Sequence, residues 1–150
     1  PEFIARRLVI VASEDIGLAN PTALLIANAT FDAIRKIGMP EGRIPLAECT
    51  IYLALSAKSN SAYMAIDAAL AEVEKSGNLP VPLHLRNAPT ALMKKMGYGQ
   101  NYLYAHNYPG NFVVQQFRPD AIADMKFWNP CSNPAEDIML QRHQSRWGDK

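Results

Sequence analysis

Residues 45–77 read PLAECTIYLALSAKSNSAYMAIDAALAEVEKSG, and the rest of the chain is expected to be built around them. Its first half carries no charged residue between Glu48 and Lys58, and its apolar side chains recur on more than one helical face. A helix that is apolar on most sides is expected to be buried on most sides. Proline suits a first helical turn, where its missing N–H has no partner to lose. The pattern therefore predicts a largely buried helix that begins near Pro45.

A second helix is predicted between the turn at residues 58–60 and Gly77, since glycine is favoured just after a helix end. Ser59 or Ser61 could cap it by accepting a backbone N–H. The two helices are expected to form a hairpin. Two interpretations of its apolar surface remain open, because that surface suits either the core of one domain or contact with another subunit. The candidate interface residues are Leu46, Leu53, Tyr63, Ile66 and Leu70.

Length and charge set limits on the function. A chain of 150 residues fits one domain and can bury a core without disulfides or metals. The net charge of +1 does not by itself predict a nucleic-acid partner. Residues 79–130, however, hold five Lys or Arg against two Asp or Glu. This mildly basic region indicates either an anionic partner or ordinary scattered surface charge.

The cysteines argue against a disulfide or zinc scaffold. Cys49 and Cys131 lie far apart, with no C-x-x-C and no Cys–His cluster, which favours a reducing cytosol. No signal peptide is found, nor an apolar run near the ~20 residues that a membrane span needs. The sequence therefore predicts a cytoplasmic protein with no membrane partner. Because it opens on Pro1 rather than Met, we expect a fragment of a longer protein.

Helix signals recur along the rest of the chain. Residues 2–16 show helical spacing up to Gly17, and a new helix is expected to begin with Asn20 as its cap and to end at Gly38. A short helix is expected over residues 90–96. The run Asn133-Pro134-Ala135-Glu136 predicts the start of a last helix, with a cap, a first-turn proline and a glutamate three residues on. The fold class predicted is mainly α.

Residues 96–117 differ from the rest, because they contain no charged residue and four of the six tyrosines. An irregular segment or a small β-hairpin around the Pro109-Gly110 turn is expected near residues 100–117. Cations and exposed aromatic rings could bind a phosphate backbone and stack on bases. Alternatively, the tyrosines form a small second core. The candidate contact residues for DNA or a protein partner are His84, Arg86, Lys94, Lys95, Tyr98, Tyr102, Tyr104 and His106.

An enzyme hypothesis would use His84 or His106, with Asp120 or Asp124 as the orienting carboxylate. Nothing in their spacing supports such a pairing. The phosphate-binding G-x-x-x-x-G-K-[ST] and dinucleotide-binding G-x-G-x-x-G motifs do not occur. We therefore predict no catalytic residue, no metal site and no cofactor for these residues.

Four longer phrases carry a resemblance to a known family. They are RRLVIVASEDIGLANP (residues 6–21), IGMPEGRIPLAECTIYLALSAKSNSAY (37–63), VPLHLRNAPTALMKKMGYG (81–99) and YLYAHNYPG (102–110). In these phrases the chain resembles the C-terminal region of the replication-associated recombination protein A family, also called MgsA. These proteins are clamp-loader-like AAA+ ATPases, and Werner helicase-interacting protein is their eukaryotic relative.

The resemblance implies a helical, collar-type oligomerisation domain over residues 1–150, which would assemble as a homotetramer. Residues 1–21 would belong in part to the helical segment that follows the ATPase lid. The ATPase domain, with its ATP and magnesium, would lie N-terminal to this chain, so no catalytic residue is carried over. The whole protein would act on DNA at replication forks in recombination and repair, near single-stranded-DNA-binding protein.

Overall fold

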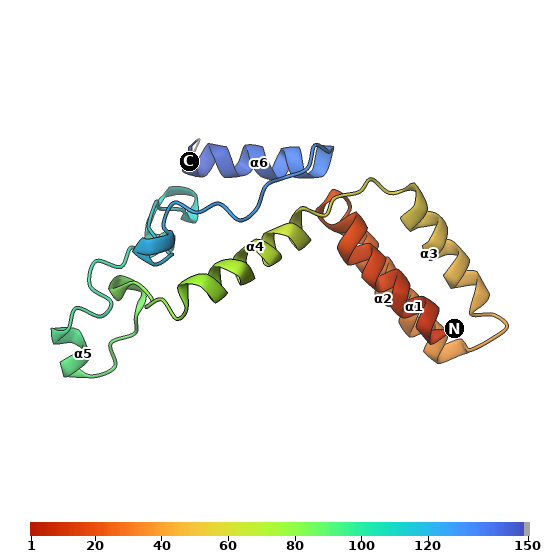
Figure 1. The fold of residues 1–150 in the computed structure, drawn as a ribbon, viewed down its shortest axis with the longest axis horizontal. Helices are drawn as coiled ribbons and strands as arrows, with labels where there is room; N and C mark the ends of the chain where they lie inside the picture. Colours follow the sequence, from red (N-terminus) through yellow and green to blue (C-terminus); the bar gives the residue numbers. More distant parts are fainter. Residues whose placement is uncertain (149–150) are drawn as a thin grey trace. The chain divides into compact units, whose positions relative to one another are not determined.

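The computed structural model describes residues 1–148, in which six α-helices are joined by turns and short 3-10 segments and no strand occurs. The prediction of a mainly α fold is confirmed. The helices are α1 Glu2–Val11, α2 Thr22–Ile37, α3 Arg43–Leu55, α4 Ser61–Ser76, α5 Ala91–Lys95 and α6 Pro134–Trp147 (Figure 1).

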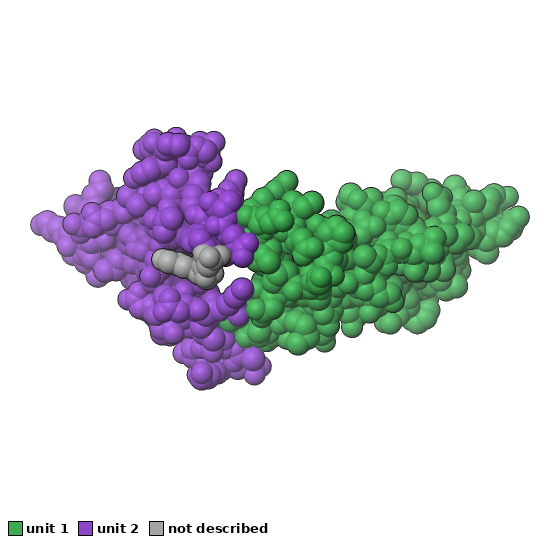
Figure 2. Space-filling model, turned by 90° about the horizontal axis from the view of Figure 1, so that it is seen from above, with its two compact units in different colours: residues 1–69, 127–142 green, residues 70–126, 143–150 purple. Residues whose placement is uncertain are grey.

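The chain divides into two compact units, coloured separately in Figure 2. Unit 1 comprises residues 1–69 and 127–142, and unit 2 comprises residues 70–126 and 143–150. Each unit therefore combines an early part of the chain with a part that follows residue 126. That the whole chain is one oligomerisation domain stays a prediction.

The core of unit 1 lies where α1, α2 and α3 pack against one another, and Figure 1 shows α1 and α2 side by side. Small side chains dominate it, which allows the helix backbones to approach closely. Its buried members are Ala12, Ile16, Ala23, Ala27, Cys49 and Leu53. Residues 1–19 thus contribute directly to this core.

Gly17 ends the first helical segment, as the sequence predicts. A π-helical turn over Ala12–Ile16 follows α1, and Gly17 then adopts a positive φ of 49°. A Cβ atom at this position would lie 2.5 Å from the carbonyl oxygen of Ser59, while the Ser59 N–H donates to the Asp15 carbonyl at 2.9 Å. Glycine is required here both by the backbone conformation and by this close approach.

The prediction that Asn20 caps α2 is wrong, since no side-chain cap bond forms at the start of that helix. The Asn20 amide instead donates to the hydroxyl oxygens of Tyr52, at 3.0 Å, and Ser56, at 3.1 Å. Asn20 therefore links the residues before α2 to Tyr52 and Ser56 at the end of α3, and its amide is used in these long-range hydrogen bonds instead of a local cap.

The two helices of residues 45–77 form where expected, but the hairpin between them does not. α3 packs on α2 and α1 rather than along α4. The prediction that α3 is buried on most sides is also wrong. Only Cys49 and Leu53 are buried, whereas Ile51 and Leu55 on its other faces are exposed. One layer of helices covers one face of α3, so its remaining apolar side chains stay accessible within this chain.

In unit 2, residues 100–117 are irregular and the β-hairpin alternative is wrong. Short 3-10 turns occupy Ala105–Asn107 and Pro109–Asn111. The side chain of the buried Gln115 bonds to the backbone of Leu103. Its Oε1 accepts from the Leu103 N–H at 2.8 Å and its Nε2 donates to the Leu103 carbonyl at 3.4 Å. A side-chain amide thus joins two extended segments that a ladder would otherwise connect.

The end of α6 provides an aromatic cluster in unit 2. The Trp147 ring lies edge-on to Phe112, with centroids 5.0 Å apart, and to Phe117, with centroids 6.4 Å apart. The Arg146 guanidinium lies 5.7 Å from the centre of the Phe112 ring. Phenylalanine and tryptophan, rather than the tyrosines, make these ring contacts.

Candidate partner-binding surfaces

Helix α4 carries a stripe of apolar side chains that are each about half exposed. Its only buried residue is Ser61. Four apolar residues at intervals of three and four share one helical face, the spacing of an apolar stripe that packs against a partner. Their exposed fractions are Tyr63 46%, Ile66 54%, Leu70 55% and Val73 58%.

Two of the five candidate interface residues lie elsewhere. Leu53 is 3% exposed and belongs to the core of unit 1, so its inclusion in a subunit interface is wrong. Leu46 is half-buried. The spacing within α3 could not separate Leu53 from its exposed neighbours, because apolar residues occur on several faces of that helix.

A second surface in unit 2 is basic and rich in tyrosine. Lys94 and Lys95 lie exposed in the last turn of α5, which Thr90 caps by accepting the Met93 N–H at 3.2 Å. Neither lysine forms an ion pair with any residue from 1 to 148. Residues 79–119 contain no Asp or Glu, so no carboxylate lies near these two lysines in the sequence.

Arg86 and Tyr98 form a fixed pair beside the lysines. The Arg86 guanidinium donates to the Val81 carbonyl at 2.6 Å and to the Tyr98 hydroxyl at 3.1 Å. It also lies 5.0 Å from the centre of the Tyr98 ring, within range of a cation–π interaction. These contacts hold Arg86 and Tyr98 in place within unit 2.

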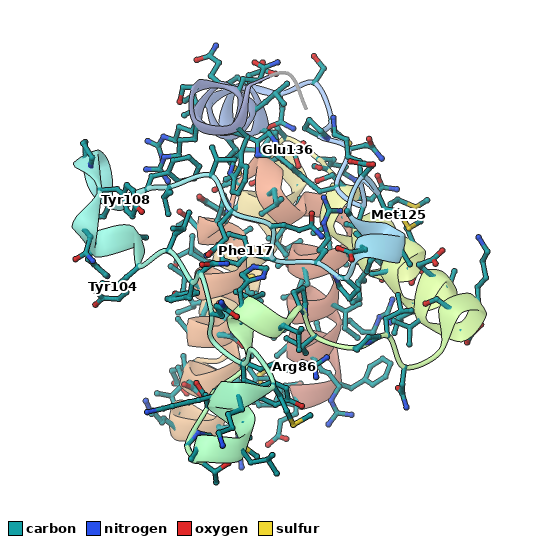
Figure 3. The ribbon with its side chains drawn as sticks, turned by 90° about the vertical axis from the view of Figure 1, so that its left-hand side faces the viewer. Arg86, Tyr104, Tyr108, Phe117, Met125 and Glu136 are labelled. Atoms are coloured by element: carbon teal, nitrogen blue, oxygen red, sulfur yellow. The ribbon has the colours of Figure 1, made fainter. Side chains whose placement is uncertain are left out.

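The later tyrosines are exposed. Tyr102, Tyr104 and Tyr108 all lie at the surface, and the Tyr104 ring is tilted against His106 with centroids 5.0 Å apart. Figure 3 shows Tyr104 and Tyr108 on one loop at the outside of the ribbon. For these three tyrosines the second-core interpretation is wrong. The sequence could not decide this, because tyrosine suits both a core and a wet surface.

The two candidate histidines are not arranged as a catalytic pair with a carboxylate. His84 Nε2 bonds to the Gln116 carbonyl at 2.7 Å, and Asp120 accepts from the Gln116 amide at 2.7 Å. No carboxylate bonds to His84 or His106 within residues 1–148. That part of the chain also lacks any group of three metal-ligating side chains.

Glu136 forms a buried polar cluster in unit 1 that sequence analysis recognised only as a helix start. Asn133 caps α6 as predicted, its Oδ1 accepting the Glu136 N–H at 3.0 Å. The Glu136 carboxylate is fully buried and accepts from Ser59 Oγ at 2.8 Å, from Ser61 Oγ, from the Cys131 N–H at 2.6 Å and from Asn133 Nδ2 at 2.9 Å. The carboxylate thus joins the start of α6 to the start of α4. The capping pattern could have indicated this position, but not its distant serine partners.

Burial acts to raise the pKa of Glu136, but the hydrogen bonds from Ser61, Ser59, Asn133 and Cys131 outweigh it and hold that pKa below its usual range. With four donors directed at its two oxygens, the carboxylate is held ionised. It acts as a structural anion, because its acceptor sites are already occupied.

None of the helices described for this chain has the length and apolar character to cross a membrane. Both cysteines are free thiols, Cys49 buried and Cys131 half-buried. The chain is a helical module with one apolar and one basic, aromatic surface and with no nucleotide-binding motif in its sequence.

Comparison with known proteins shows to which protein family the chain belongs. The family model described as MgsA AAA+ ATPase C terminal matches residues 1–147. The chain therefore belongs to the MgsA family of AAA+ ATPases, of which it represents the C-terminal region.

Three relatives show how the chain relates to whole proteins of this family. It is 42% identical to replication-associated recombination protein A of Coxiella burnetii, over 91% of this chain and 31% of that protein. It is 43% identical to the Bacillus subtilis protein of the same name, over 86% and 31%. With ATPase WRNIP1 of Dictyostelium discoideum the identity is 44%, over 85% and 15%. The chain thus spans a third or less of the length of these curated relatives.

Proposed function

We propose that this chain is the self-association region of an AAA+ ATPase that acts in replication-associated recombination and DNA repair, and that it assembles as a homotetramer. In this proposal, ATP and magnesium bind to an ATPase domain outside these residues, and the protein acts in the cytoplasm at replication forks beside single-stranded-DNA-binding protein. The family and the names of the relatives support the general role.

The observation that carries the assembly proposal is the exposed stripe on α4. Tyr63, Ile66, Leu70 and Val73 lie on one face and are each about half exposed in the single chain. Contiguous exposed apolar surface of this kind marks interaction sites in soluble proteins. Burying it would contribute about 25 cal/mol per Å² before the entropic costs of association. A second copy of the same chain is the partner that a homo-oligomeric ATPase always has available.

Charge substitutions on two faces of α4 test this proposal. Ile66→Asp places a carboxylate within the stripe and is expected to reduce the sedimenting mass of the chain, because a buried unpaired charge is costly. Ala68→Asp is the matched control, since at 100° per residue this exposed position lies opposite the stripe. Far-ultraviolet circular dichroism checks that both variants stay helical. If the mass of the Ile66→Asp variant equals that of the parent oligomer, the stripe is not the interface.

A second candidate function is contact with a single-stranded nucleic acid through residues 84–108. The observation that favours it is the pair of exposed lysines without an ion pair among residues 1–148, in a stretch, residues 79–119, that holds no Asp or Glu and contains three exposed tyrosines. Lysines neutralise phosphates, and exposed aromatic rings stack on bases without sequence preference.

The double substitution Lys94→Glu/Lys95→Glu tests the nucleic-acid contact. We expect it to weaken oligonucleotide binding and to reduce the steepness of the log K against log salt plot by about 1.4, since each lost phosphate contact on a single strand contributes about 0.7. The control Lys36→Glu/Lys58→Glu changes the net charge equally at exposed positions of unit 1. An equal effect of both double substitutions would show that only total charge matters and would contradict a localised contact.

A further inference from the structure

Unit 2 contains a hollow of about 590 Å³, within the range of about 300–1,000 Å³ typical of small-molecule sites. Three segments of unit 2 supply its walls, with lining residues at 83–84, at 95–97, 100–101 and 103, and at 115–116. Leu83, Met96 and Leu103 give it apolar surface, and no Asp or Glu lines it.

Several polar groups at the hollow are already committed to the fold. Gln115 uses its amide on the backbone of Leu103, as described above. The Gln116 amide nitrogen donates to the Arg118 carbonyl at 3.1 Å and to Asp120 at 2.7 Å. The Gln116 carbonyl can only accept, so the His84 Nε2 bonded to it carries a hydrogen. These groups shape the walls of the hollow.

Three other polar groups at the hollow remain uncommitted. The side-chain amides of Gln100 and Asn101 and the ammonium of Lys95 make no hydrogen bond or ion pair with residues 1–148. A primary amide presents a donor and an acceptor side by side, which matches the edge of a nucleobase. The ammonium is a point charge suited to a phosphate.

We propose that this hollow accepts one unstacked base of a bound single strand, with Gln100 and Asn101 against the base edge and Lys95 on the adjoining phosphate. The proposal rests on the second candidate function above. The apolar walls would contact the face of the base. Tyr102 is exposed and lies between Asn101 and Leu103 in the sequence, and in this proposal its ring stacks on the next base along the strand. An acidic peptide could also use Lys95, but the exposed tyrosine and the two free amides favour a base.

Fluorescence anisotropy on the 150-residue chain tests this inference with two labelled strands, a 15-nucleotide oligo-dT and the same backbone with abasic sites. We expect oligo-dT to bind about tenfold more tightly, because the abasic strand keeps its phosphates but offers no base. The double substitution Gln100→Ala/Asn101→Gly removes the contacts to the base edge but keeps the apolar walls and Tyr102, so it is expected to reduce this difference severalfold and leave binding of the abasic strand unchanged. Glycine suits position 101, where φ is 62°. Asn87→Ala, an exposed amide outside the hollow, is the control and is expected to keep the tenfold ratio.

The possible results separate this inference from the function it rests on. Equal binding of both strands by the unsubstituted chain would overturn the base site while leaving the phosphate contact in place. A tenfold ratio that survives in the Gln100→Ala/Asn101→Gly variant would also overturn it. If neither strand binds, the nucleic-acid function itself is contradicted. If an oligo-Asp peptide displaces oligo-dT, and does so less well from the Gln100→Ala/Asn101→Gly variant, the hollow is a peptide site and the base assignment is wrong.

Discussion

Glu136 shows how one residue can fix a local arrangement that its neighbours in sequence do not reveal. Its carboxylate is fully buried and is surrounded by donors from residues 59–61 and 131–133. Ser61 also accepts from the Trp128 indole N–H at 3.1 Å, which adds Trp128 to the same cluster. Without the negative charge, these donors would face either a weaker hydrogen-bond acceptor or another donor.

The substitution Glu136→Gln tests this cluster. It replaces one acceptor oxygen with an NH₂ donor that would face other donors, so we expect the free energy of unfolding to fall by about 1–3 kcal/mol. Urea denaturation followed by circular dichroism measures this loss. An unchanged unfolding midpoint would show that the cluster does not stabilise unit 1. The control Asp137→Asn removes an equal charge at the exposed adjacent position and is expected to change little.

The same carboxylate gives unit 1 a pH dependence. Its pKa is lower in the folded state than in the unfolded chain, so the unfolded chain binds more protons between the two values. This stability is fully present above the ordinary glutamate pKa of about 4.3 and is lost as the pH falls through the lower folded-state pKa. The parent chain should therefore lose stability on acidification over this window more steeply than the Glu136→Gln variant.

Among the helices, α3 contains two leucines that differ strongly in burial. Leu53 is 3% exposed and lies in the core of unit 1, whereas Leu55 is 83% exposed. We expect Leu53→Ala to cost about 2–5 kcal/mol of stability, through lost burial and a cavity. Leu55→Ala makes the same chemical change and is expected to cost little in the isolated chain. Thermal unfolding of both variants compares them, and equal losses would contradict the packing of α3 on α1 and α2.

The elements themselves follow from local signals, which is why their positions could be predicted. Gly17 ends the first helical segment, Thr90 starts α5, and Asn133 with Pro134 starts α6. In each case the signal lies within a few residues of the structure that it determines, as a cap bond or a positive φ. Helix start and stop signals of this kind can be recognised in the sequence without knowing the rest of the fold.

The errors concern contacts over long sequence distances. Asn20 has the chemistry of a cap but bonds to residues more than thirty positions away. The face of α3 that is buried depends on where α1 and α2 pack, and no periodicity within α3 contains that information. The basic surface was found by composition, but whether its tyrosines were buried or exposed depended on packing. The hollow beside Lys95 was missed, because its walls come from three separate segments.

At the scale of the whole molecule, the chain is the C-terminal region of a protein in the MgsA family of AAA+ ATPases. Its two surfaces suit different tasks in the proposed protein. The stripe on α4 would hold copies together by apolar burial, while the basic surface of unit 2 would contact a single strand. The proposed self-association matters most for the whole protein, because an AAA+ nucleotide site that lies beside a neighbouring subunit needs subunits that stay together.

Multi-angle light scattering of the purified 150-residue chain, across a range of protein and salt concentrations, tests the proposed self-association. We expect a mass near four times 16.6 kDa that persists on dilution and at high salt, since apolar burial is not screened by ions. A mass of 16.6 kDa at every concentration would contradict it. That result would show that the exposed stripe on α4 does not drive assembly of this chain.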